Sequence, residues 1–465
     1  MAQCNDKGLE RLLKILLVTI PNVFRESEII DMTYLESMGI LYVAGALRAQ
    51  GYDVDCWDSI ILGGIPGLKG YMQLNDFKDG AIYLGLNPNY LQYKIRQFKP
   101  DIIGMSLQHT SDYNLALAIM STIKAEFPKV IIVAGGPHVT QNIKECVDNK
   151  YIDYAIMGEG EIAFPMLVQE IENGNMTPDI PGVCYENKIT DFELIQNVDD
   201  IGIPAWGLLP MRGEYLHWCN AEGRKISIYS SRGCPYDCNF CSSKTLNKRK
   251  WRAHSVDRVL FEIDLLVKDF RVGGILFRDD YLNVDIARMN KILEGVINNK
   301  YGIMLEAANL RADNLPRETL ELMKKAGFVR ANLFPESGSQ RVLNDLMNKN
   351  LDLGKFHKAV EDALDVGLNV GLCLMIGYPG ETMDEINQTF KMAHKLKEKG
   401  VKYFQISIAT PIPGTKMYDT CLQNGYIDSM KVDTFGYHVT AFDTEHWKGE
   451  DLIKLMEKEV MELNR

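Results

Sequence analysis

Short runs of β-branched and other apolar residues alternate with longer stretches of helical period along almost the whole chain. A strand followed by a helix and a second strand forms a right-handed βαβ unit, and repeated units build a parallel sheet covered by helices on both faces. The sequence therefore predicts an α/β fold. Residues 196–224 show no clear period, and they divide the alternation into two blocks.

The first block is predicted to be a doubly wound, Rossmann-like domain over residues 1–195. Its five expected strands are 15–20, 53–57, 102–106, 130–134 and 153–157. Such a sheet binds ligands at the carboxyl ends of its strands, where the strand order reverses. Residues 196–224 are expected to form a linker across the surface.

The second block is predicted to be a (βα)6 partial TIM barrel over residues 225–415. Its six expected strands are 226–231, 274–278, 303–308, 329–334, 368–376 and 402–408. In a barrel of this kind the functional loops follow the carboxyl ends of the strands. Residues 416–465 are expected to form a small C-terminal helical segment.

Composition excludes several classes of protein. The 465 residues are 46% hydrophobic and 24% charged, which rules out a disordered chain. The 51 basic and 62 acidic residues give a net charge of −11, so we expect no nucleic-acid partner. No apolar run approaches the ~20 residues of a membrane span. The start of the chain lacks a secretory signal, so a cytoplasmic protein is expected.

Three cysteines follow the first strand of the second block in a C-x3-C-x2-C pattern: Cys234, Cys238 and Cys241. Soft thiolates prefer zinc, Cu(I) or an iron–sulfur cluster. Structural zinc needs four ligands, and the next candidate, His254, lies 13 residues further on. A 4Fe–4S cluster held by three cysteines leaves one iron open. The pattern favours this cluster, with zinc and three unrelated buried cysteines as alternatives.

The pattern resembles the radical S-adenosylmethionine (SAM) superfamily, and the preceding RGCP resembles its branch with an N-terminal cobalamin-binding domain. The resemblance covers residues 14–415. It implies that the three cysteines hold a 4Fe–4S cluster and that SAM chelates the open iron through its amine and carboxylate. It also implies that an electron from the cluster cleaves the sulfonium to give a 5′-deoxyadenosyl radical, which abstracts a hydrogen from the substrate.

The same resemblance assigns SAM-binding residues at the ends of other strands. Asp280, rather than Asp279, is expected to accept hydrogen bonds from the methionine ammonium, with helix capping as the alternative. Glu336 is expected at the ribose or amino-acid part, with a barrel ion pair as the alternative. Arg311 is expected near the cofactor carboxylate, with an exposed arginine as the alternative. The full expected set is Phe240, Asp280, Arg311, Glu336, Ser337 and Gly377.

Four loops of the first block resemble the cobalamin-binding domain of this branch. The paired glycines Gly135 and Gly136 would let backbone approach the nucleotide tail closely. No D-x-H-x-x-G sequence is present, so cobalamin is expected with its own base displaced and no histidine on cobalt. An ordinary Rossmann-like domain is the alternative. The expected contacts are Pro21, Ser106, His109, Thr110, Gly135, Gly136, Pro137, His138, Gly158 and Glu159.

These cofactors imply methylation of an unactivated carbon or phosphorus centre by way of methylcobalamin. Oxidative cyclisation or rearrangement is the alternative. Methylthio transfer to tRNA is disfavoured because it needs three cysteines in the first domain, and a light or redox sensor is a further alternative.

We expect a small-molecule, lipid or peptide substrate and an electron donor such as flavodoxin or ferredoxin. The expected substrate pocket lies between barrel mouth and cobalamin, near Trp206, Tyr215, His217 and Trp218.

Overall fold

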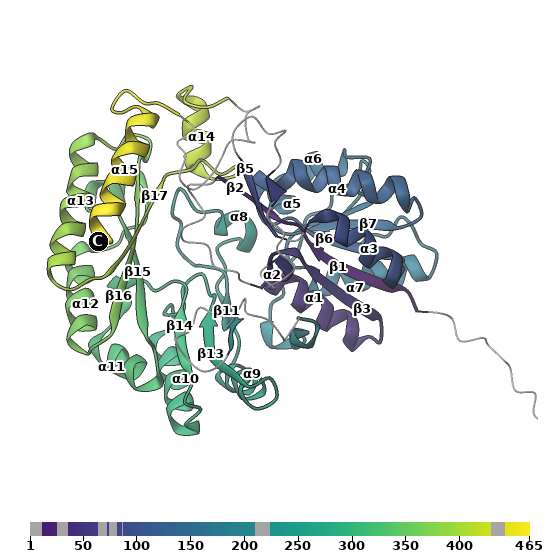
Figure 1. Cartoon of the computed structure of the whole chain (residues 1–465), viewed down its shortest axis with the longest axis horizontal. Helices are drawn as coiled ribbons and strands as arrows, with labels where there is room; N and C mark the ends of the chain where they lie inside the picture. The colour runs from purple at the N-terminus through teal and green to yellow at the C-terminus, as the bar shows by residue number, and fades with distance from the viewer. Residues whose placement is uncertain are drawn as a thin grey trace, which may run out of the picture. The chain divides into compact units, whose positions relative to one another are not determined.

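The computed structural model describes residues 12–25, 36–63, 72–73, 81–85, 87–209, 224–428 and 442–465. These residues fall into two compact units (Figure 1). The first unit holds residues up to 195 together with 201–209, and the second holds 196–200 together with the chain from 224 onward. In the described parts of the chain, no helix has the length and apolar character that a bilayer crossing requires.

The first unit is built on a six-stranded sheet in the order β3-β1-β6-β7-β8-β9. The first five strands run parallel and confirm the five predicted strands, whereas β9 pairs antiparallel with β8 and was not predicted. The strands are β1 (Lys14–Thr19), β3 (Asp53–Asp58), β6 (Ile102–Ser106), β7 (Ile131–Gly135), β8 (Tyr154–Ile156) and β9 (Val183–Cys184).

The parallel strands have the doubly wound order 2-1-3-4-5, whose direction reverses between β1 and β6. A separate antiparallel sheet, β2-β5-β4, was not predicted, because strands of two to four residues carry too little alternation to be recognised. Its strands are β2 (Asn22–Arg25), β4 (Met72–Gln73) and β5 (Ala81–Leu84).

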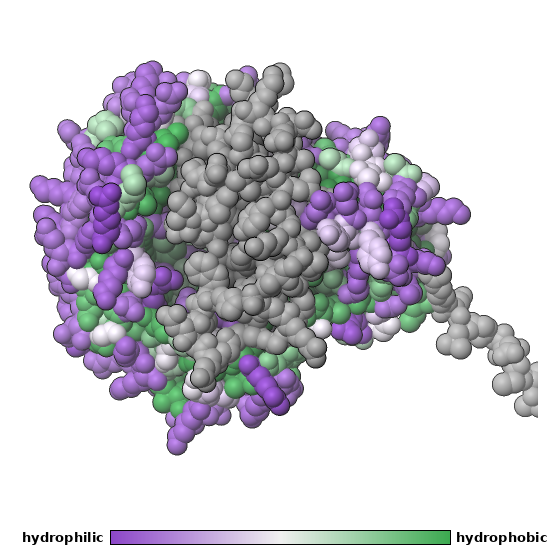
Figure 2. Space-filling view, viewed as in Figure 1, coloured by the Kyte–Doolittle hydropathy of each residue, from purple (hydrophilic) through white to green (hydrophobic). Residues whose placement is uncertain are grey.

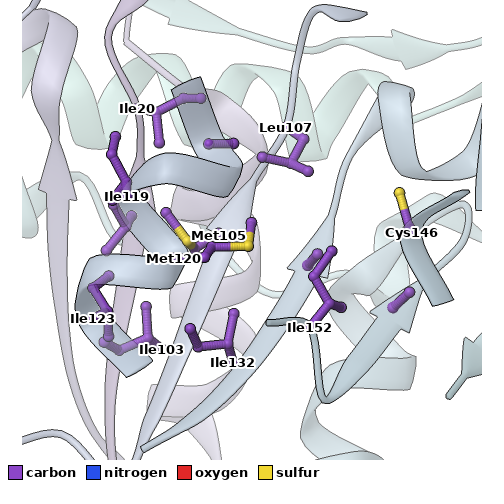
Figure 3. Packing of buried hydrophobic residues seen from close by; sticks show 14 of the residues in the cluster. Ile20, Ile103, Met105, Leu107, Ile119, Met120, Ile123, Ile132, Cys146 and Ile152 are labelled. Carbon is purple, nitrogen blue, oxygen red and sulfur yellow. The ribbon is translucent and has the colours of Figure 1, made fainter. Parts of the chain in front are cut away.

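Alternate residues of the strands contribute side chains to two hydrophobic cores, one on each face of the sheet. Ile103 and Met105 of β6 pack with Met120 of α4 on one face (Figure 3). Ile15 and Leu17 of β1 belong to the core on the other face. The long helices are α1 (Met38–Ala49), α3 (Pro88–Phe98), α4 (Tyr113–Glu126) and α7 (Gly160–Glu172), and the short ones are α2 (Ser59–Gly63), α5 (Pro137–Gln141) and α6 (Ile143–Val147).

The second unit contains six parallel strands in two groups, β10-β13-β14 and β15-β16-β17. Single bridges, Leu305 with Phe328 and Leu310 with Leu333, join the groups. The six predicted strands and the partial barrel are confirmed. The strands are β10 (Arg224–Ile228), β13 (Val272–Phe277), β14 (Met304–Ala307), β15 (Arg330–Glu336), β16 (Asn369–Ile376) and β17 (Tyr403–Ile408).

Amphipathic helices connect these strands and cover the outside of the sheet. In α13, Ile386, Phe390 and Leu396 are buried, while the outward surface of this part of the unit is mostly hydrophilic (Figure 2). The connecting helices are α9 (Val256–Lys268), α10 (Ile286–Asn299), α11 (Arg317–Ala326), α12 (Leu353–Asp365) and α13 (Met383–Glu398). The C-terminal segment adds α14 (Lys416–Gln423) and α15 (Gly449–Leu463).

The segment after residue 195 is shared between the units. Asp199 bonds to His254 of the second unit, with 3.0 Å between Oδ1 and Nδ1. The backbone N–H of Ala205 donates to the carbonyl of Leu41 in the first unit at 2.9 Å, and Trp206 is buried there. The other expected pocket aromatics, Tyr215, His217 and Trp218, lie outside the described residues. The predicted boundaries at 195, 224 and 415 stay predictions.

Candidate active site

The cysteine loop begins in a short hairpin at the end of β10. Strand β11 (Ser231–Arg232) pairs antiparallel with β12 (Arg252–Ala253), which closes the base of the loop. Gly233 has a φ of +82°, and a Cβ there would lie 2.2 Å from the carbonyl oxygen of Lys250. A side chain cannot occupy that space, so glycine is required where the chain turns toward Cys234.

The middle of the cysteine loop is held by a second segment of the chain. The backbone N–H of Asn239 donates to the carbonyl of Met347 at 2.8 Å, and its side-chain Nδ2 donates to that of Leu346 at 2.7 Å. Asn348 Nδ2 donates in turn to the carbonyl of Asp237 at 2.8 Å. The carbonyl of Asn239 accepts from the N–H of Met417 at 2.9 Å. The backbone between Cys238 and Cys241 is therefore fixed by the protein itself.

The three thiols form a donor set that fits an iron–sulfur cluster. Cys234, Cys238 and Cys241 are free, and Cys234 is buried while the others are half-buried. Burial raises the pKa of Cys234 to about 11 and that of Cys241 to about 12, so cluster binding must displace protons from these thiols. His254, the candidate fourth zinc ligand, has its Nδ1 bonded to Asp199.

Two neighbouring carboxylates at the end of β13 have different roles. Asp279 is fully buried and accepts hydrogen bonds from the N–H and hydroxyl of Ser230 at 3.1 and 2.8 Å, and from the hydroxyl of Ser231. Asp280 is partly exposed and accepts from the Ser243 hydroxyl at 3.0 Å. The capping alternative for Asp280 is wrong, because Asp285 caps α10. Asp279 fixes the hairpin, and the contact of Asp280 with the SAM ammonium stays a prediction.

Arg311 is buried, so the alternative of an exposed arginine is wrong. It is 4% exposed, and its guanidinium lies 3.9 Å from the centroid of the Tyr236 ring. Its Nε donates to Asp313 at 2.7 Å, and its NH2 donates to the carbonyls of Lys349 and Asn350 at 3.1 Å. The guanidinium therefore connects the cysteine loop to the segment that holds it.

Glu336 forms an ion pair with a residue that the sequence analysis did not single out. Its Oε1 lies 2.7 Å from Nζ of Lys349, which is 1% exposed. Glu336 has a φ of +68°, which is rare for a residue other than glycine and points to a constrained site. The ion-pair alternative for Glu336 is thus confirmed, and its contact with SAM stays a prediction. The neighbouring Ser337 is fully buried, and its hydroxyl accepts from the N–H of Ser339 at 3.1 Å.

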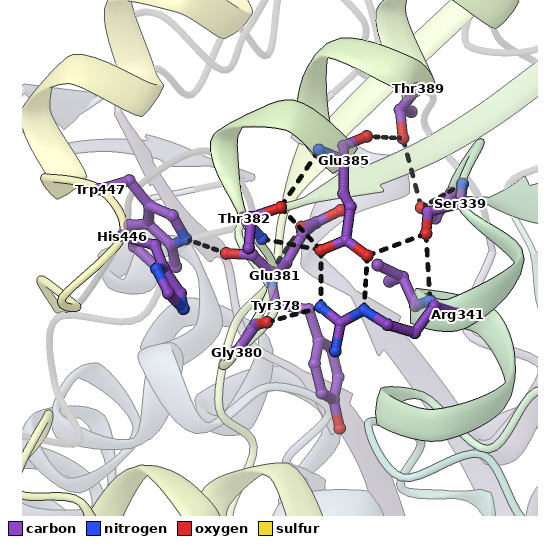
Figure 4. A network of polar contacts seen from close by, with 12 residues as sticks. Ser339, Arg341, Tyr378, Gly380, Glu381, Thr382, Glu385, Thr389, His446 and Trp447 are labelled. Carbon is purple, nitrogen blue, oxygen red and sulfur yellow. Dashed lines mark hydrogen bonds and ion pairs between the residues drawn. The ribbon is translucent and has the colours of Figure 1, made fainter.

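The turn after β16 is built around a buried carboxylate (Figure 4). Gly377 has a φ of +77°, and its N–H and that of Tyr378 donate to Oε2 of Glu381 at 2.8 and 3.0 Å. Burial raises the pKa of Glu381 to about 8. In the same network, the Arg341 guanidinium holds the pKa of Glu385 down to about 2. Gly377 thus lies in a tight turn, and its contact with SAM stays a prediction.

The carboxyl edge of the first unit's sheet gathers the loops after β1, β6, β7 and β8. Gly136 has a φ of +105°, and a Cβ there would lie 2.7 Å from the carbonyl oxygen of Leu107. At Gly135 such a Cβ would lie 3.8 Å from the carbonyl oxygen of Ile156, an ordinary contact distance, so the fold itself does not require glycine there. Gly158 has a φ of +70°, and a Cβ there would strike the ring of Phe192. Of the other expected contacts, Pro21 is buried, Ser106, His109 and Thr110 are half-buried and Pro137 is exposed.

Two expected cobalamin contacts make hydrogen bonds within the first unit, and their contact with cobalamin stays a prediction. His138 is not in a loop but in α5, and it is 1% exposed with its Nδ1 3.1 Å from the Thr110 hydroxyl. Burial lowers its pKa to about 4, so it is neutral at pH 7. Oε2 of Glu159 accepts from the N–H of Ile195 at 2.8 Å. The pattern of glycines and histidines could not reveal which side chains turn inward.

Comparison with known proteins identifies the family. The model of the B12 binding domain matches residues 33–168, and the model of the radical SAM superfamily matches residues 228–393. An uncharacterized methyltransferase of Pyrococcus horikoshii is 30% identical, and the match covers 96% of this chain and 92% of that protein. This chain is a cobalamin-binding radical SAM enzyme. Its cofactors are therefore a 4Fe–4S cluster, SAM and cobalamin.

A further relative and two solved structures are similar to most of this chain. The cytidylyl-2-hydroxyethylphosphonate methyltransferase of Streptomyces wedmorensis is 24% identical, over 90% of this chain and 83% of that protein. The methyltransferase TsrM of Kitasatospora setae has a TM-score of 0.68 at 15% identity, covering 90% of this chain and 76% of that one. OxsB has a TM-score of 0.71 at 16% identity, covering 96% of this chain and 66% of that one. These structures share the two-part fold.

Proposed function

We propose that this radical SAM enzyme methylates an unactivated carbon or phosphorus centre of a small-molecule, lipid or peptide substrate. The observation that carries the proposal is the similarity to a methyltransferase along 96% of the chain, which includes both the cysteine loop and the glycine-rich sheet edge. When bound, the cluster supplies the electron that cleaves SAM, and cobalamin supplies the methyl group. The protein binds and orients these groups.

The net reaction follows from these parts. The substrate R–H, two molecules of SAM and two electrons give R–CH3, 5′-deoxyadenosine, methionine and S-adenosylhomocysteine. The hydrogen removed from the substrate leaves in 5′-deoxyadenosine, and the methyl group comes from the second SAM. Because two electrons enter from outside, we propose a flavodoxin or ferredoxin as donor and the cytoplasm as the location.

Each cofactor has proposed contacts among the residues described above. Cys234, Cys238 and Cys241 would hold the cluster. SAM would be bound by Asp280 at its ammonium, Arg311 at its carboxylate, Glu336 and Ser337 at its ribose or amino-acid part, and Gly377 and Phe240 beside its base and sulfur. Cobalamin would lie on the edge with Gly135 and Gly136, without a histidine on cobalt. The buried position of His138 and the bond at its Nδ1 support this last point.

The test uses anaerobically reconstituted enzyme with SAM labelled as CD3, a one-electron reductant and a pooled extract of cellular small molecules. Formation of both 5′-deoxyadenosine and S-adenosylhomocysteine, together with a product that carries a CD3 group, is expected. A product without a CD3 group, formed with 5′-deoxyadenosine alone, would instead indicate cyclisation or rearrangement.

Two cysteine variants control this experiment. Cys234→Ala should lower the rate of 5′-deoxyadenosine formation at least about a thousandfold, which corresponds to about 4 kcal/mol of transition-state stabilisation. Cys56→Ala removes a half-buried thiol on β3 of the first unit and should leave that rate unchanged. Equal activity in both variants would contradict the assigned cluster ligands.

A further inference from the structure

Lys349 is the most deeply buried lysine near the cysteine loop. Its side chain is 1% exposed in a stretch that follows the one-turn π-helix Val342–Leu346. Its Nζ donates to Oε1 of Glu336 at 2.7 Å and to the hydroxyl of Tyr281 at 3.2 Å. A buried ammonium is costly unless it is paired and hydrogen-bonded, and these two contacts meet that need.

The position of Lys349 relative to the cysteines is fixed by the backbone. The residues just before it, Leu346 to Asn348, make the three hydrogen bonds to Asp237 and Asn239 described above. The carbonyl of Lys349 accepts from Arg311 at 3.1 Å. Nζ itself lies 5.9 Å from the ring centroid of Phe240, which is the residue between Asn239 and Cys241. Lys349 cannot move away from the loop without breaking this set of bonds.

Lys349 carries a positive charge at neutral pH. Burial alone would lower its pKa, but the negative charge of Glu336 and the contact with Tyr281 raise the pKa above its usual value. The ammonium is therefore a fixed positive charge beside the cysteine loop, and Glu336 is the negative charge paired with it.

We propose that Lys349 is a buried charge that raises the reduction potential of the cluster held by Cys234, Cys238 and Cys241, and that Glu336 moderates this effect. A cluster gains one negative charge on reduction, so a fixed cation within the same low-dielectric site favours the reduced form. The proposal concerns electron entry, and it does not depend on which reaction the enzyme catalyses afterwards.

The test is a redox titration of the reconstituted full-length enzyme, without SAM or substrate, followed by the EPR signal of the reduced cluster. Lys349→Met should lower the equilibrium constant for one-electron reduction about tenfold, which is a shift of about 59 mV to more negative potential. Glu336→Gln removes the negative partner and should shift the potential in the opposite direction. The double variant should have a potential between those of the two single variants, because it loses both the positive and the negative charge.

Control variants separate charge from structure. Lys291→Met removes an exposed lysine on α10 and should leave the potential unchanged. Iron and sulfide content measures whether each variant retains its cluster. Where Lys349→Met fails to assemble one, Glu336→Gln still tests the proposal, since it leaves Lys349 in place. A wild-type potential in a fully loaded Lys349→Met, or shifts of the same sign for Lys349→Met and Glu336→Gln, would overturn the proposal.

Discussion

The two candidate cofactor sites are built from different types of residue. The barrel mouth uses charged side chains that are buried and paired, such as Arg311 with Asp313 and Lys349 with Glu336. The sheet edge of the first unit uses glycines, Gly135 and Gly136 above all, and its histidine and glutamate candidates make hydrogen bonds within the unit. SAM is small and carries several charges, whereas cobalamin is large and is fringed by neutral amides. The mouth is thus suited to recognise charge, and the edge is suited to provide room.

Removing one charge at the mouth should have the largest effect. Asp280→Asn is expected to weaken SAM binding by about ten- to a hundredfold, because a hydrogen bond to a charged group contributes about 1.5–3 kcal/mol. The measurement is the dissociation constant for SAM of the cluster-loaded enzyme, by equilibrium dialysis.

The neighbouring carboxylate is the matched control. Asp279→Asn disturbs the bonds to Ser230 and Ser231, so it should lower the free energy of unfolding. It should not cause a selective loss of SAM affinity. An Asp280→Asn enzyme with wild-type affinity for SAM would show that the mouth does not recognise the ammonium through this residue.

Alanine substitutions at the sheet edge should have different effects at the two neighbouring glycines. Gly136→Ala places a side chain in a backbone region nearly confined to glycine and against Leu107, so it should lower the free energy of unfolding by about 1–3 kcal/mol. Gly135→Ala meets no atom closer than 3.8 Å and should leave stability unchanged while weakening cobalamin binding several-fold.

Urea unfolding and the absorption of bound cobalamin provide the two readouts for these glycine variants. If Gly135→Ala bound cobalamin as tightly as the wild type, this result would contradict the idea that cobalamin binding requires the absence of a side chain at this position.

The smallest expected effect is on the pH dependence of stability, and it concerns two carboxylates within the barrel. Burial raises the pKa of Glu381 to about 8, so the folded protein binds more protons than the unfolded chain between the ordinary glutamate pKa and pH 8. Stability should therefore fall as the pH rises through this window, by about 1 kcal/mol between pH 7 and 8. Urea unfolding of Glu381→Gln should lack this part of the slope.

Glu385 supplies the opposite case in the same network. Arg341 lowers its pKa to about 2, so its contribution is present above the ordinary glutamate pKa and is lost only as the pH falls toward 2. Glu385→Gln should consequently keep the wild-type slope between pH 6 and 8. A flattened slope in this variant would contradict the assignment of the titration to Glu381.

The sequence predicted the framework because buried parallel strands leave continuous apolar runs, and all eleven expected strands are present in the structure. The cysteine motif predicted its own chemistry because its three ligands are local in sequence. Lys349 was missed because its partners, Glu336 and Tyr281, are brought to it only by the barrel. His138 was misplaced for the same reason, since its motif does not say which face of α5 is buried.

The bonds around Asn239 have one more consequence. This residue ties the cysteine loop to Leu346 and Met347 on one side and to Met417 on the other, through groups that do not involve iron. The path of the loop is thus maintained by the polypeptide, so exposure to air should strip the metal and leave the surrounding architecture in place. An oxidised molecule could then be repaired by supplying fresh iron and sulfide, without refolding.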